Sequence, residues 1–251
     1  MPEQKDLISD LDALLSRQAT EATRLDEDVG SEDELSSGNT VIVQPLRWPE
    51  IKVEGTSVTI VAVLLDDSGS ISGDGKDEKL TEGAEDMIEQ LKSVAREGKE
   101  IFLNITGFRR TYFSGNVLHA DSDEILRGVR FVHDSTPLVR TSLEIARTAD
   151  CVETVLNNQG ISVRVSMLLI TDGLPNSDIT PFKFKEQCIK KYPHWKFSGM
   201  GITCEDEREA SYYREEFTKT FEKMGIDNIV TPSTNGVKEA LYQYSKSVSM
   251  L

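Results

Sequence analysis

Apolar residues along this chain fall into two patterns, continuous runs and helical stripes, and the two patterns alternate. Residues 58–65 and 163–171 are continuous runs rich in β-branched side chains, typical of strands buried on both faces of a sheet. Residues 78–97 carry apolar side chains three and four positions apart, which predicts an amphipathic helix. The same criteria predict further strands at 101–108, 112–118, 195–202 and 226–230, and further helices at 123–128, 142–157, 181–191, 206–223 and 237–248.

This alternation predicts an α/β fold. Repeated strand and helix units build a doubly wound, mostly parallel sheet with helices on both faces. We expect one short antiparallel strand at the edge of the sheet, at residues 112–118. Ligands of such sheets bind at the carboxyl ends of the strands, near the point where the strand order reverses.

Oxygen-bearing side chains directly follow both of the continuous runs. Asp66, Ser68 and Ser70 come after the first run, and Asp172 comes after the second. Between them Thr136 offers another hydroxyl where a helical pattern begins. One such cluster would indicate only a turn, but a second loop at a second strand end favours a shared site. Carboxylates and hydroxyls are hard oxygen ligands, so the sequence predicts a site for a Mg²⁺-like cation.

These loops resemble the motifs of von Willebrand factor A domains, which carry a metal-ion-dependent adhesion site. Asp66, Ser68 and Ser70 match the DxSxS motif of that family. Asp172 matches the aspartate of its TDG-like loop, and Thr136 its intervening threonine. The resemblance covers residues 56–249 and implies a Rossmann-like fold.

The resemblance also implies a function in protein–protein interaction. It implies bound Mg²⁺, with Mn²⁺ or Ca²⁺ as alternatives, and Asp172 acting through water. One coordination position would stay open for an acidic residue of a partner protein. The residues before Thr136 depart from the family pattern, which makes Thr141 a rival for the threonine role. By analogy, such a module would be an adaptor in a bacterial or phage stress or defence system, or beside an AAA-type ATPase.

A metal-dependent phosphohydrolase that uses the same acidic loops is the alternative function. A phosphatase of the haloacid dehalogenase type needs a second aspartate two residues after Asp66, where Ser68 stands. The chain has no GxxxxGK[ST] phosphate-binding loop, and no GxSxG elbow surrounds Ser68. We therefore expect a protein that is not an enzyme.

For the residues next to the predicted site, we expect structural roles. Arg109, Arg110, Tyr112 and Phe113 form a basic and aromatic patch after a predicted strand. We expect this patch to be an exposed turn and a packing edge. Asp67 is expected to lie behind the metal ligands or to face solvent.

Charge and hydropathy divide the chain into three parts. Residues 1–40 hold eleven carboxylates against three basic side chains, which predicts an acidic N-terminal extension, partly helical or disordered. Its apolar stripe is expected to dock on its own domain, with docking on a partner as the alternative. Residues 41–55 are a connecting segment in which Trp48 serves packing, and residues 56–251 form the domain.

Composition also excludes several classes of protein. The formal net charge of −15 argues against binding to nucleic acid, whose phosphates attract a basic surface. No apolar run approaches the ~18 residues of a membrane span, and the N-terminal residues lack the pattern of a signal peptide. We therefore expect a cytoplasmic protein. The three cysteines are scattered, which favours buried small apolar residues over disulfides or a zinc site.

Overall fold

A computed structural model describes residues 41–43, 48, 51–129, 131, 136–175 and 179–251 of the chain. The predicted acidic extension at residues 1–40 lies outside the described residues. The two predicted strand ends that carry Asp66 and Asp172 lie within them. Among the described helices, none combines the length and the apolar character that crossing a membrane requires.

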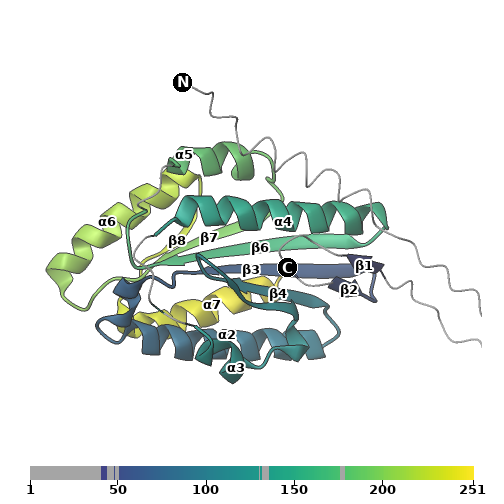
Figure 1. Cartoon of the computed structure of the whole chain (residues 1–251), viewed down its shortest axis with the longest axis horizontal. Helices are drawn as coiled ribbons and strands as arrows, with labels where there is room; N and C mark the ends of the chain where they lie inside the picture. The colour runs from purple at the N-terminus through teal and green to yellow at the C-terminus, as the bar shows by residue number, and fades with distance from the viewer. Residues whose placement is uncertain (1–40, 44–47, 49–50, 130, 132–135, 176–178) are drawn as a thin grey trace, which may run out of the picture.

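Six described strands form one sheet, in the order β5-β4-β3-β6-β7-β8 (Figure 1). Every neighbouring pair is parallel except β4 and β5, which are antiparallel. The α/β fold with a mostly parallel sheet and one short antiparallel edge strand is therefore confirmed. The strands are β3 (Ser57–Leu65), β4 (Ile101–Thr106), β5 (Thr111–Asn116), β6 (Ser162–Thr171), β7 (Lys196–Gly201) and β8 (Asn228–Val230).

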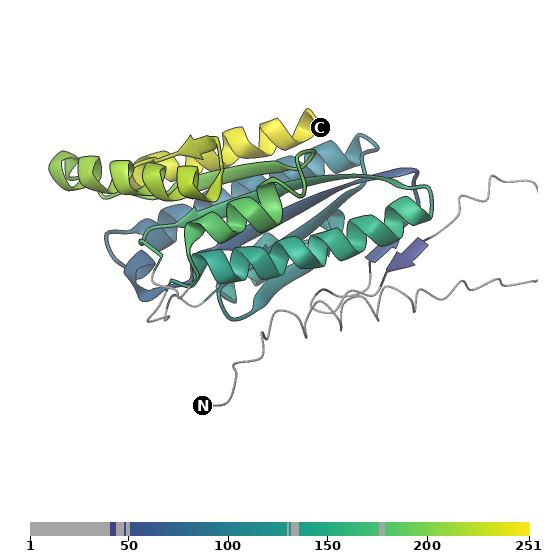
Figure 2. The same ribbon diagram turned by 90° about the horizontal axis from the view of Figure 1, so that it is seen from above.

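The helices cover the sheet in two layers, as Figure 1 shows. Figure 2 shows the molecule from above, with the first layer in front of the sheet and the second layer behind it. The first layer consists of α4 (Leu138–Asn158), α5 (Pro181–Phe184) and α6 (Glu207–Met224). The second consists of α2 (Lys76–Arg96), α3 (Ser122–Arg127) and α7 (Val237–Ser249).

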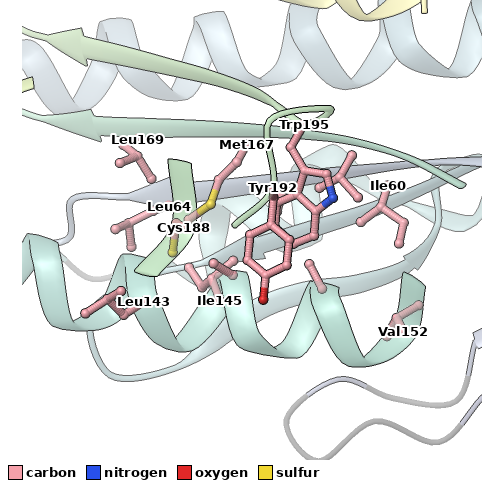
Figure 3. Close-up of a cluster of buried hydrophobic side chains, with 14 of the residues drawn as sticks. Ile60, Leu64, Leu143, Ile145, Val152, Met167, Leu169, Cys188, Tyr192 and Trp195 are labelled. Atoms are coloured by element: carbon pink, nitrogen blue, oxygen red, sulfur yellow. The ribbon is translucent and has the colours of Figure 1, made fainter. Parts of the chain in front are cut away.

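The central strand β3 packs on both layers because successive side chains of a strand point to opposite faces. Ile60 and Leu64 belong to the core beneath α4, and Val61 and Val63 belong to the core beneath α2 and α7. Figure 3 shows the first of these cores, where Leu64 lies near Leu143 of α4 and Ile60 lies further along the strand, on the side of Val152. The strand is buried on both faces, as its continuous apolar sequence predicts.

Two details of the prediction are wrong. Helix α4 begins at Leu138, four residues before the predicted start at 142, because Pro137 can stand immediately before a helix without losing a needed hydrogen bond. Of the cysteines, only Cys188 is buried, and burial raises the pKa of its thiol to about 12. The other two cysteines, Cys151 and Cys204, are half-buried.

The predicted connecting segment, residues 41–55, contains two short antiparallel strands, β1 (Val41–Val43) and β2 (Ile51–Val53). Trp48 is buried and stacks on Phe102 of β4, with 5.7 Å between the ring centroids. Ile51 and Val53 join the same core. The predicted packing role of Trp48 is confirmed.

The strand order reverses between β3 and β6. From β3 the chain passes through α2 to β4 on one side, and from β6 it passes through α5 to β7 on the other. The loops that leave β3 and β6 therefore diverge and leave room between them at the carboxyl edge of the sheet. These loops carry residues 66–70 and 172–173.

Candidate metal centre

Asp66 is held at the end of β3 by its neighbour strand. The parallel register pairs Leu65 with Ile170, which places Asp66 beside Thr171. The Thr171 hydroxyl donates to Asp66 Oδ2 at 2.6 Å, and the backbone N–H of Ser68 donates to Oδ1 at 2.9 Å. The residue is 0% exposed, so the carboxylate is fixed by groups of the strand ends themselves.

Three more predicted ligands form a chain of hydrogen bonds beside it. The hydroxyl oxygens of Ser68 and Ser70 lie 2.9 Å apart. Ser70 then donates to Asp172 Oδ1 at 2.6 Å, across 102 positions of sequence. The structure thus brings the loops of Asp66 and Asp172 to one edge of the molecule.

Thr136 and its rival Thr141 lie in different places. A Cβ atom placed on Gly173 would be 3.3 Å from Thr136 Oγ1, so Thr136 lies against the residue that follows Asp172. Thr141 lies in α4 and lines a cavity of about 330 Å³ together with Trp48. Of these two threonines, the geometry favours Thr136, which lies against the loop of Asp172.

Asp67 does not face solvent. It is 2% exposed and its carboxylate accepts two hydrogen bonds, from the Tyr112 hydroxyl at 2.6 Å and from the backbone N–H of Phe108 at 3.0 Å. A Cβ atom on Gly107 would lie 2.3 Å from Asp67 Oδ2, so only glycine allows this close approach. Asp67 therefore ties the loop of Asp66 to the turn between β4 and β5.

The role of Tyr112 differs from the packing edge that the sequence predicts. Its hydroxyl reaches Asp67 over 45 positions of sequence. The guanidinium of Arg110 lies 4.7 Å from the centre of the Tyr112 ring, so part of the basic patch supports this contact.

A lysine that the sequence analysis did not single out also enters the site. Lys76, the first residue of α2, places its ammonium 2.9 Å from Asp172 Oδ2. The Lys76 side chain is 13% exposed and the Asp172 side chain is 0% exposed. No sequence signal separates Lys76 from the other lysines of α2, because its partner is 96 positions away.

The electrostatics of the site favour the arrival of a positive charge. Burial raises the pKa of the Asp66 carboxyl, and the negative charge of Asp172 raises it further. Hydrogen bonds from Ser68 and Thr171 oppose this effect in part. A buried carboxylate whose ionised form is disfavoured gains when a cation compensates its charge.

The residues present fit a hard divalent cation. Two carboxylates and three hydroxyls meet at one edge, and such all-oxygen donor sets suit Mg²⁺, Ca²⁺ and Mn²⁺. Among the described residues there is no group of three or more histidine, cysteine, aspartate or glutamate side chains that could hold a metal ion. The candidate centre therefore depends on hydroxyl donors as much as on carboxylates.

Comparison with solved structures identifies the fold. The chain is similar to proximal thread matrix protein 1 from the mussel byssus, in a structure with a zinc-occupied MIDAS motif. The two are 14% identical, the TM-score is 0.52, and the match covers 77% of this chain and 48% of the mussel chain. This chain therefore spans about half the length of that protein.

A second similar structure is the vWF domain of the type V pili tip protein Mfa5 from Porphyromonas gingivalis, at 10% identity and a TM-score of 0.48. That match covers 78% of this chain and 96% of the other. No protein-family model and no curated protein matches the sequence. The chain has the von Willebrand factor A type of fold, as the sequence motifs implied.

Proposed function

We propose that this chain is a metal-dependent protein-interaction module, an adaptor that recognises an acidic residue of a partner protein. Asp66, Ser68, Ser70, Thr136 and Asp172 would hold Mg²⁺, or Mn²⁺ or Ca²⁺ in its place. The observation that carries the proposal is the hydrogen-bonded chain from Ser68 through Ser70 to Asp172, beside the buried Asp66. It gathers donors from distant segments at one edge of the sheet.

The residues of the chain have distinct tasks in this proposal. Asp66 supplies a carboxylate whose position is fixed by Thr171 and Ser68. Ser68 and Ser70 supply neutral oxygens, so they leave most of a cation's charge uncompensated. A divalent cation held there would supply positive charge that attracts the carboxylate of a partner. Ser70 is exposed whereas Asp66 is fully buried, so the open side of the site is the side of Ser70.

A capture experiment tests the proposal. Immobilised protein is incubated with lysate of the source cell in Mg²⁺ or in chelator, beside Asp66→Ala and the control Asp227→Ala. Asp227 is exposed and immediately precedes β8, at the edge of the sheet opposite to the site. We expect the same protein to be captured by wild type and Asp227→Ala in Mg²⁺ only, and not by Asp66→Ala. Equal capture in chelator would contradict a role of the metal in recognition.

The enzymatic alternative has its own assay. Turnover of a generic phosphoester with Mg²⁺, lost in Asp66→Asn, would favour a phosphohydrolase over an adaptor. The assignment as a protein without enzymatic activity stays a prediction, as do the cytoplasmic location and a partner from an ATPase or defence assembly.

A further inference from the structure

Lys76 occupies an unusual place for a lysine. It is the first residue of α2, where the helix dipole disfavours a positive charge. The acidic residues Asp77 and Glu78 of the same turn suit this position, and Lys76 does not. Its ammonium therefore does not stabilise the helix that carries it.

The backbone before Lys76 is bent to deliver this side chain inward. Asp74 and Gly75 both adopt the left-handed conformation, with φ angles of 57° and 69°. Such conformations carry a cost for a residue with a Cβ atom and are common at functional sites. The turn aims Lys76 at Asp172, and the ammonium is largely withdrawn from water.

Both carboxylate oxygens of Asp172 are engaged in this arrangement. Its Oδ1 accepts from the Ser70 hydroxyl and its Oδ2 accepts from Lys76. A divalent cation that used Ser70 and Asp172 would lie beside the ammonium. Two positive charges repel each other strongly where water is excluded, so the ammonium and the cation compete for Asp172.

We infer that Lys76 is a tethered counter-ion that Asp172 exchanges for a divalent cation. This inference rests on the proposed cation site. Without the cation, Lys76 compensates the buried charge of Asp172 and keeps the loop of Asp172 in place. When the cation binds, the ammonium leaves Asp172 for solvent. Lys76 thereby raises the cation concentration at which the adhesive form of the site is reached.

A binding experiment on the full chain tests the exchange, with Mn²⁺ as the probe. Isothermal titration compares wild type, Lys76→Met and the control Lys79→Met. Lys79 lies on the same helix and pairs with Glu82 at the surface, 3.0 Å away. We expect Lys76→Met to bind Mn²⁺ at least about tenfold more tightly than wild type, because no charge-assisted hydrogen bond has to be broken. Lys79→Met should bind as wild type does.

The outcomes separate this inference from the proposed function. If Lys76→Met binds Mn²⁺ as wild type does, or more weakly, Lys76 is a structural or positioning residue and the exchange is refuted, while the cation site stands. If neither protein binds Mn²⁺, the cation site and the exchange are both refuted.

Lysine labelling gives a second test that needs no variant. Wild-type protein is acetylated briefly with and without Mn²⁺, and each lysine is followed by mass spectrometry. We expect the reactivity of Lys76 to rise several-fold with Mn²⁺, because its ammonium leaves Asp172, whereas Lys79 reacts equally in both samples. A Lys76 that is equally protected in saturating Mn²⁺ would overturn the exchange.

Discussion

The hydrogen bond between Tyr112 and Asp67 is expected to hold the loop of Asp66 in place, and Tyr112→Phe removes it with little other change. The ring and its contact with the Arg110 guanidinium are retained. What is lost is one hydrogen bond of 2.6 Å to a carboxylate that is 2% exposed. Hydrogen bonds to charged groups contribute about 1.5–3 kcal/mol to stability, and Asp67 would keep the bond from the backbone N–H of Phe108.

We therefore expect the free energy of unfolding to fall by about 1.5–3 kcal/mol in Tyr112→Phe. For a domain of this size that corresponds to a melting temperature lower by roughly 3–12 °C. Urea unfolding followed by circular dichroism measures the free energy, in chelator so that metal binding does not contribute. Tyr212→Phe is the control, because Tyr212 is 57% exposed on α6. A Tyr112→Phe variant within about 0.5 kcal/mol of wild type would refute the role of this bond.

Two further predictions concern the buried charge and the packing of the sheet. Because burial raises the pKa of Asp66, ionisation costs stability as pH rises from its usual value of 3.8 through the raised value. The stability of Asp66→Asn relative to wild type, both free of metal, should therefore be higher at pH 7 than in acid below the usual pKa, as urea unfolding at the two pH values measures; a difference between the two proteins that does not change with pH would contradict the charge argument. In Gly201→Ala the new Cβ would lie 2.4 Å from the Phe217 ring, so thermal unfolding should show a loss of about 1–3 kcal/mol. Gly115→Ala, whose Cβ meets only Phe113 at 3.4 Å, should change little by comparison, and equal melting temperatures for the two variants would refute this packing argument.

The fold could be predicted because its main signals are local. The continuous runs at 58–65 and 163–171 are β3 and β6, and strands of this kind need both faces covered. The alternation of strands and helices then restricts the topology to a parallel sheet. The start of α4 could not be placed, because the residue at its N-cap is Pro137, which offers no side-chain capping hydrogen bond.

The candidate site could be predicted in part for a related reason. Asp66 and Asp172 directly follow strands, and the parallel register brings such strand ends together. Lys76 and Tyr112 could not be found in this way. Each reaches its partner from an element whose rotation about its own axis depends on packing, and no local pattern reports which way a single side chain points.

The cation site is tested most directly by a crystal structure of the full chain soaked with Mn²⁺, with anomalous diffraction locating the ion. We expect a Mn²⁺ peak at the carboxyl edge of the sheet, in contact with oxygens of Asp66, Ser68 and Ser70. A well-ordered crystal in saturating Mn²⁺ with no peak at these residues, or with its strong peak elsewhere, would contradict the claim that this edge is a cation site.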